Sequence, residues 1–346
     1  MHIELRSVVV KGIEEKPLTE WLTARVENLD SPLKFELITG GHSNLTYKVT
    51  DGDGRKWVLR RPPLGHVLEG AHDMVREHRL LSSLNDSDVP VPSVVGLCTD
   101  STVNGADFYV TEFVEGHVLR DHDSASEVVA DRRSEVGPEL IKALAAIHSV
   151  DLEATSLADL GKREDYVARQ LRTWLRQFNA MTSRDLPLIE RVHDALSAQV
   201  PEQREATLIH GDFRLDNCLV STQGEVAAVL DWEISTLGDP LADLGILLAY
   251  WSEPDDTFLP LGDAATVHGG FSSREQLVSE YGRVTGRDTS DMDFFFAFAS
   301  WRLACILEGV HARYVGGANV EIPDEVEIFP HSVVHLAERA ARIMGV

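Results

Sequence analysis

The period of the hydrophobic pattern changes near residue 115, which limits this chain to folds with two different parts. Before that point, short runs predict strands at 35–38, 45–49, 56–60, 94–98 and 108–113, and the first two of these alternate between apolar and polar residues. Asp51-Gly52 separates two of these runs, and Asp-Gly in that position is typical of an antiparallel hairpin. A helical pattern from Ala71 to Leu84 follows the third strand. We therefore expect residues 1–115 to form a five-stranded antiparallel sheet with one helix.

After Gly116 the apolar residues recur at helical spacing. Stretches near 140–147, 166–178, 277–284, 294–315 and 333–344 each present an apolar face. A strand-rich island at 207–232 interrupts them. The charge density changes as well, because residues 1–115 hold 12 basic and 18 acidic side chains and the remainder holds 20 and 38. We expect an α+β protein with a smaller N-terminal lobe, 1–115, and a larger, mainly helical lobe, 116–346.

The composition excludes several classes of protein. The chain has 346 residues, of which 43% are hydrophobic and 25% charged, the ordinary mix of a globular protein. Its formal net charge of −24 repels nucleic acid and anionic lipid headgroups. The apolar runs at 244–251 and 294–301 fall short of the ~18 residues that span a bilayer. Three scattered cysteines and the absence of a signal-peptide pattern lead us to expect a cytoplasmic protein with no nucleic-acid or membrane partner.

The island at 207–232 contains polar residues with an interpretable spacing. His210-Gly211-Asp212 directly follows an apolar strand, and Asn217 leads into the next one. This is the spacing of the kinase pattern H-x-D-x-x-x-x-N, in which the carboxylate accepts a hydroxyl proton and the amide oxygen binds Mg²⁺. Asp231 ends the following strand, where a second magnesium ligand would fit. The pattern predicts a phosphoryl-transfer site, and a coincidental β-hairpin is the alternative.

These motifs resemble the aminoglycoside phosphotransferase family of kinase-fold enzymes. The resemblance lies in Leu208–Asp212, Asn217, Val229–Glu233 and Gly238–Gly245, and it is strongest to the branch that includes kinase-like domains fused to some acyl-CoA dehydrogenases. It implies a bilobed protein-kinase-like fold, ATP or GTP with Mg²⁺, and phosphorylation of a small-molecule hydroxyl. It also implies site residues: Asp212 as catalytic base, Asn217 and Asp231 as magnesium ligands, and His210 and Asp243 as support for the catalytic loop.

The resemblance places nucleotide contacts in the first 115 residues. In the turn at 40–44, the backbone of Gly41, Ser43 and Asn44 would cover the phosphates, although a plain hairpin turn explains the same residues. The fifth strand ends where a kinase hinge would bind the base. There the backbone of Glu112 and Val114 would hydrogen-bond adenine.

Arg60 occupies the position of the phosphate-binding lysine of kinases, which is a departure from the usual pattern. Arginine keeps the positive charge of lysine, and its guanidinium can donate two parallel hydrogen bonds to a phosphate. Lys56 lies on the same face of the strand and is the alternative. Glu77, on the following helix, is the expected ion-pair partner of Arg60.

The acceptor and two other functions remain open at this point. Aromatic and basic residues alternate along 166–178 and recur at 301–313, which indicates either a core stripe or a wall for an anionic or CoA-bearing acceptor. We predict an ATP- or GTP-dependent phosphotransferase acting on an aminoglycoside-like compound, a hydroxyacyl derivative or another metabolite. A nucleotide-binding pseudokinase with a regulatory role and a metal-dependent phosphohydrolase are the alternatives.

Overall fold

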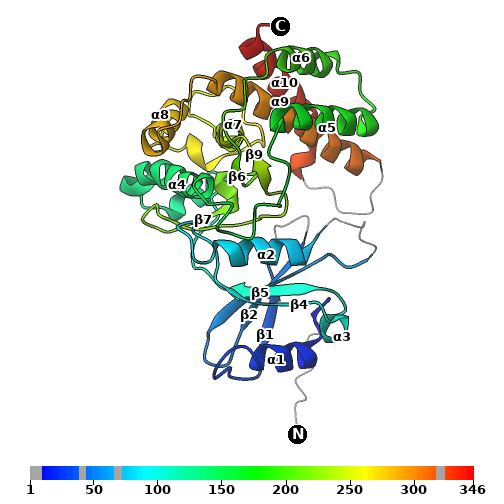
Figure 1. The fold of residues 1–346 in the computed structure, drawn as a ribbon, viewed down its shortest axis with the longest axis vertical. Helices are drawn as coiled ribbons and strands as arrows, with labels where there is room; N and C mark the ends of the chain where they lie inside the picture. The colour runs from blue at the N-terminus through cyan, green and yellow to red at the C-terminus, as the bar shows by residue number, and fades with distance from the viewer. Residues whose placement is uncertain (1–9, 39–43, 66–71, 317–323) are drawn as a thin grey trace. The chain divides into compact units, whose positions relative to one another are not determined.

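The computed structural model describes residues 10–38, 44–65, 72–316 and 324–346 (Figure 1). The chain divides into two compact units. The N-terminal unit comprises Met1–Ser87 and Val91–Val114, and the C-terminal unit comprises Asp88–Pro90 and Glu115–Val346.

The N-terminal unit is built on one antiparallel sheet with the strand order β1-β2-β3-β5-β4. The strands are β1 (Lys34–Leu37), β2 (Leu45–Thr50), β3 (Lys56–Arg61), β4 (Val94–Cys98) and β5 (Phe108–Glu112). Arg60 in β3 lies opposite Thr46 in β2 and Tyr109 in β5. The predicted α+β class and the five strands are confirmed.

Helices cover both faces of this sheet. Leu18, Trp21 and Leu22 of α1 (Glu15–Thr23) pack into a core with alternate strand residues such as Leu59. Tyr109 and Arg60, on the opposite face, contact α2 (Met74–Leu84). A short helix, α3 (Ser101–Asn104), joins β4 to β5. The prediction of a single helix in this part was wrong, because α1 and α3 are too short to give a sustained periodic signal and form by packing and turn chemistry.

The C-terminal unit is mainly helical. Its α-helices are α4 (Arg133–His148), α5 (Tyr166–Met181), α6 (Pro187–Ala198), α7 (Pro240–Tyr250), α8 (Arg274–Thr285), α9 (Met292–Val315) and α10 (Phe329–Met344). Its 3₁₀ turns are Ser124–Glu127, Ala130–Arg132, Leu215–Asn217, Ala265–Val267 and Asp324–Glu327. Two antiparallel pairs complete it: β6 (Thr207–Ile209) with β9 (Thr236–Gly238), and β7 (Cys218–Val220) with β8 (Val226–Val229). The helix α6 has no counterpart among the predicted elements.

Helix α9 is the central helix of this unit. It packs against α5, α7 and α10. By length and composition it could cross a membrane, with a mean hydropathy of 1.2 over an 18-residue window, so the expectation that no segment reaches this length was wrong. However, 78% of that window is buried inside the protein. This degree of burial is typical of a helix in the hydrophobic core of a protein.

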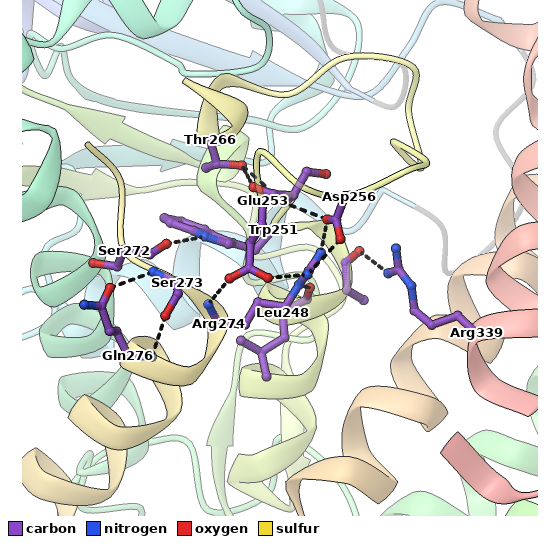
Figure 2. Close-up of polar contacts among 12 residues, drawn as sticks. Leu248, Trp251, Glu253, Asp256, Thr266, Ser272, Ser273, Arg274, Gln276 and Arg339 are labelled. Carbon is purple, nitrogen blue, oxygen red and sulfur yellow. Dashed lines mark hydrogen bonds and ion pairs between the residues drawn. The ribbon is translucent and has the colours of Figure 1, made fainter. Parts of the chain in front are cut away.

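The segment 251–273, between α7 and α8, is held at both ends by polar contacts (Figure 2). Trp251 Nε1 donates to the carbonyl of Ser272 at 2.9 Å. The guanidinium of Arg274 donates to Glu253 Oε2 at 2.8 Å and to Asp256 Oδ1 at 3.1 Å. The two ends of the segment are therefore fixed to each other at the first turn of α8.

Candidate active site

The turn that follows β6 is fixed by a carboxylate of α7. Gly211 has φ = +85°, and a Cβ at this position would lie 3.0 Å from the carbonyl oxygen of Ile234, so glycine is required there. Asp243 accepts hydrogen bonds from the backbone N–H of His210 at 2.6 Å and of Gly211 at 2.8 Å. The structure thus brings together Asp243, His210 and the residue that precedes Asp212.

Asp243 is fully buried and depends on a partner that the sequence pattern did not reveal. His148, at the end of α4, places Nε2 3.4 Å from Asp243 Oδ2, and its Nδ1 lies 2.8 Å from the hydroxyl of Tyr281. Burial alone would raise the pKa of Asp243, but the contact with His148 and the backbone N–H groups outweigh it and hold the pKa below its usual value. Asp243 is therefore ionised in the folded protein.

The ring of His210 connects the catalytic loop to the strand before Asp231. The N–H of Asp212 donates to His210 Nδ1 at 3.3 Å. Because Nδ1 accepts, the proton resides on Nε2, which donates to the carbonyl of Leu230 at 2.8 Å. The ring is fully buried and also contacts Trp232. His210 therefore acts as a structural link between the two polar segments.

One oxygen of the Asp212 carboxylate is engaged by its neighbours. Oδ2 accepts from Asn217 Nδ2 at 2.9 Å and from Arg214 Nε at 3.2 Å. Asn217 Nδ2 also donates to the carbonyl of Asp212 at 2.9 Å. The carboxylate is thus oriented from one side, and no hydrogen bond from the described part of the chain reaches Oδ1.

Arg214 is a functional candidate that the spacing argument missed. It bridges Asp212 to Asp216, and its guanidinium lies 4.8 Å from the ring centre of Tyr250. Burial opposes the charge on Arg214, but Tyr250 and the two carboxylates outweigh it and raise the pKa. A permanent positive charge therefore lies beside the Asp212 carboxylate. Its position two residues after Asp212 was the only signal in the sequence.

The two predicted magnesium ligands are connected through the backbone. Asp231 adopts φ = +64°, a left-handed conformation that aspartate tolerates better than most residues. The N–H of Leu230, directly before it, donates to the carbonyl of Asn217 at 2.8 Å. An amide oxygen and a carboxylate are hard ligands that fit Mg²⁺. Among the described residues no group of three or more His, Cys, Asp or Glu side chains forms a metal cage, so phosphate oxygens would have to complete the coordination.

In the N-terminal unit, Arg60 and Glu77 form the expected ion pair. Arg60 Nε lies 3.1 Å from Glu77 Oε2, and Glu77 is 2% exposed. The hydroxyl of Tyr109 donates to Oε2 at 3.0 Å, and Asn44 Nδ2 donates to Oε1 at 3.1 Å. Two hydrogen-bond donors and the charged Arg60 side chain therefore converge on one buried carboxylate. They fix Glu77 as the anchor that orients Arg60.

The other basic residues of β3 have separate contacts. Arg61, on the opposite face, donates to the carbonyls of Gly12 and Asn104 at 2.7 and 2.9 Å and is buried. Lys56 lies over the ring of Phe113, with Nζ 5.3 Å from the ring centre. Arg60 forms an ion pair with the α2 carboxylate of Glu77.

The remaining predicted nucleotide contacts are only partly described. Gly41 and Ser43 lie outside the described residues. At the end of β5, the N–H of Glu112 donates to the carbonyl of Ser93 at 2.8 Å, so this N–H is already used within the sheet. Val114 follows β5 outside the strand. An adenine bound here would meet the carbonyl of Glu112 and the backbone of Val114.

Comparison with known proteins gives a consistent result. Residues 34–283 match the model of the phosphotransferase enzyme family. The chain is 39% identical to acyl-CoA dehydrogenase family member 10 of Mus musculus over 83% of its length, and 35% identical to family member 11 of Gallus gallus over 96%. It spans only 27% and 43% of these relatives, which are much longer proteins.

Solved structures support the same assignment. A Ralstonia eutropha protein described as a candidate aminoglycoside phosphotransferase superposes with a TM-score of 0.79 at 30% identity, covering 95% of this chain and 98% of that one. The aminoglycoside phosphotransferase APH(4)-Ia, as a thermostable mutant with ADP and hygromycin B, shares the fold with a TM-score of 0.60 at 16% identity, covering 96% of this chain and 98% of that one. With the match over residues 34–283, these similarities show that the chain belongs to the phosphotransferase enzyme family.

Proposed function

We propose that this protein transfers the γ-phosphoryl group of ATP to a hydroxyl group of a small molecule. The observation that carries the proposal is the hydrogen bonding of Asp212. Since Asn217 and Arg214 both donate to Oδ2, the carboxylate is oriented with Oδ1 available to accept the acceptor's proton. A positioned general base of this kind accelerates a reaction by ~10²–10⁴-fold.

The nucleotide phosphates are negatively charged, and two sets of groups suit them. Asn217 Oδ1 and the Asp231 carboxylate would hold Mg²⁺, which when bound offsets the charge of the phosphates. Arg60, oriented by Glu77, would donate to phosphate oxygens. The ADP in the aminoglycoside phosphotransferase complex supports a nucleotide as the phosphoryl donor.

The acceptor is a small hydroxylated molecule in this proposal. An aminoglycoside-like compound, a hydroxyacyl derivative and another metabolite are the classes to compare, with ATP and GTP as donors. Nucleic acid and membranes are not among the proposed partners, given the formal net charge of −24. We propose a cytoplasmic location, in keeping with three buried free cysteines.

The test is release of ADP from Mg-ATP, or of GDP from Mg-GTP, by purified protein with a panel of these acceptors. Wild-type protein should release ADP with at least one acceptor, and Asp212→Asn should lose most of kcat while binding Mg-ATP normally. Asp194→Asn is the matched control, because Asp194 lies on α6 with 84% of its side chain exposed. Full turnover by Asp212→Asn would refute the assigned base.

The same assay separates the two alternatives. Mg-ATP binding without ADP release on any acceptor would favour a regulatory pseudokinase, for which the arginine at position 60 is the supporting observation. Phosphate release from phosphate esters without a nucleotide would favour a phosphohydrolase.

A further inference from the structure

Arg302 is a buried cation for which the proposed reaction has no role so far. It lies on α9, is 5% exposed, and its Nη2 donates to the carbonyl of Gly211 at 2.8 Å. Within the described part of the chain, its Nε and Nη1 have no hydrogen-bond partner. A guanidinium stays charged under all conditions in which proteins fold, and leaving its donors unpaired in the interior is costly. Two donors of Arg302 therefore lack the oxygen acceptors that a buried arginine normally has.

The residues in direct contact with Arg302, Gly211 and Trp174, are uncharged. Tyr166 and Tyr250 are close enough to interact with it electrostatically. Burial raises the pKa of Tyr166 to about 12 and also raises that of Tyr250, so both phenols stay neutral. In the described ranges, Arg302 forms no ion pair with a carboxylate. The positive charge is therefore available to an anion that is not part of the protein.

Arg302 is also close to the reacting centre. Its hydrogen-bond partner Gly211 directly precedes Asp212 in the chain. The 2.8 Å contact, the planar peptide bond between Gly211 and Asp212 and ordinary side-chain geometry together place the Asp212 carboxylate within roughly 9 Å of Nη2. A small molecule could therefore contact both Arg302 and the Asp212 carboxylate.

Trp174 covers the guanidinium. It lies on α5, and the centre of its ring is 5.2 Å from the guanidinium carbon of Arg302. Its indole N–H donates to Gln170 Oε1, one turn earlier, at 2.9 Å. Unlike the buried Tyr166 and Phe178 of the same helix, Trp174 is half-buried. The aromatic residues of α5 thus lie mostly in the core, and Trp174 is the one whose ring is partly exposed to solvent.

We propose that Arg302 binds an anionic group of the phosphoryl acceptor, a carboxylate or a phosphate, after the ring of Trp174 moves aside. The anion would take the donors at Nε and Nη1, while Nη2 stays on Gly211. The acceptor is then a small hydroxylated anion whose hydroxyl reaches Oδ1 of Asp212. This inference rests on the proposed function and gives it a substrate class of definite charge.

The first experiment compares matched acceptors. ω-Hydroxy acids of three to six carbons, their neutral amides and the corresponding hydroxyalkyl monophosphates are assayed for ADP release. We expect at least one acid or monophosphate to have a KM about 10- to 100-fold below that of its neutral counterpart, as for a charge-assisted hydrogen bond. Preference for the acids or for the monophosphates identifies the source of the anion. Equal KM values for charged and neutral acceptors would overturn the proposal.

The second experiment assigns the preference to Arg302. Arg302→Gln should raise the KM of the charged acceptor about 10- to 100-fold and leave that of the neutral one unchanged. Arg302→Lys should give an intermediate value, because lysine keeps the charge and a donor for Gly211. Arg313→Gln is the matched control, since Arg313 lies exposed on the same helix. An equal loss of kcat with both acceptors, at unchanged KM, would show that Arg302 only positions the backbone at Gly211 and does not bind the acceptor.

A binding measurement keeps the inference testable if Arg302→Gln fails to fold or if no acceptor is turned over. Titration of wild-type protein with the same hydroxy acids and monophosphates, with ADP present, should give heat and a change in tryptophan fluorescence. Trp174→Phe should abolish the fluorescence change without abolishing binding. Binding without turnover would support the Arg302 site while contradicting the proposed function. No binding of any charged probe would overturn the site, whatever the enzyme turns over.

Discussion

The ion pair between Arg60 and Glu77 gives a direct prediction at the scale of single residues. Arg60→Ala and Glu77→Gln should each raise the KM for ATP, and the double variant should show coupling of ~0.5–3 kcal/mol because the two side chains share one contact. Arg60→Lys should keep partial activity, since a point charge still meets phosphate. The measurement is a double-mutant cycle on ATP binding.

The control for that cycle is Lys56→Ala, on the same face of β3. It should leave ATP binding unchanged, because Lys56 begins β3, four residues before Arg60, and its Nζ lies 5.3 Å from the ring centre of Phe113. Suppose instead that the Arg60 and Glu77 variants change ATP affinity little and additively, and that Lys56→Ala lowers it strongly. The phosphate contact would then be assigned to Lys56.

The two proposed magnesium ligands should differ in effect. Asp231→Ala removes a full negative charge and should abolish Mg²⁺-dependent ATP affinity, whereas Asn217→Ala should weaken it less. Asn217→Ala should also lower kcat, because it removes a donor to Asp212 Oδ2. Calorimetric titration with ATP at several Mg²⁺ concentrations, beside steady-state assays, measures both. Small and equal losses of affinity in the two variants would place the metal elsewhere.

Residue roles could be predicted from the sequence only where the partners are near in the chain. Asp212 and Asn217 are five positions apart, so a local pattern contained both. His148 meets partners that lie 95 and 133 positions away, and only the folded chain brings them together. Arg302 and Gly211 are 91 positions apart, so the sequence could suggest a basic wall but not its contact with the catalytic loop.

At the scale of elements, α7 is the helix that links the core to the catalytic loop. Its N-cap, Asp239, accepts from the N–H of Leu241 at 3.0 Å and is 7% exposed. Burial raises the pKa of Asp239 to about 6, with Glu205 adding to the rise. The folded state then binds a proton more tightly than the unfolded state, so this group's contribution to stability falls as the pH rises from about 4 to 6.

Asp239→Asn removes that pH-dependent cost and keeps an oxygen for the N-cap. At pH 7 it should stabilise the protein by on the order of 1–3 kcal/mol, and it should flatten stability between pH 4 and 6. Denaturant unfolding at several pH values measures this. Ser273→Ala is the contrasting variant, since it removes the capping box of α8 and should destabilise by ~1 kcal/mol at every pH. If Asp239→Asn were less stable than wild-type protein at pH 7, burial of the ionised Asp239 carboxylate would not be destabilising.

Helices and strands could be predicted from the sequence where their hydrophobic pattern continues over many residues. Strands β2 and β3 alternate between buried and less buried residues, and α9 continues for 24 residues. In contrast, α1 has nine residues and one set of core positions, so most of its stability comes from packing on the sheet. The helix α6 starts at Pro187 without a side-chain cap, so its N-terminus lacked the usual capping signal.

At the scale of the whole molecule, the dominant property is the formal net charge of −24. Self-repulsion of like charges destabilises a compact chain, and salt screens it over about 10 Å at 0.1 M. Raising NaCl from ~10 to ~150 mM at pH 7.5 should therefore raise Tm. Near the sequence pI of about 4.9 the same change should have little effect, because the net charge is close to zero. A Tm that falls with salt at pH 7.5 would mean that local ion pairs outweigh the net repulsion.

The fixed ends of segment 251–273 have a consequence for how the sequence of this region can vary within the family. Its residues Pro260, Leu261 and Asp263–Thr266 line a hollow together with Leu215 and Asp216 of the catalytic loop. Because Arg274 and Trp251 tie the ends, a change of length or sequence near the tip costs only a small extra loop-closure entropy and leaves the anchors in place. The residues that line this hollow can therefore change in number and in type while the anchors of the segment, and the hydrogen bonds of Asp212, stay as they are.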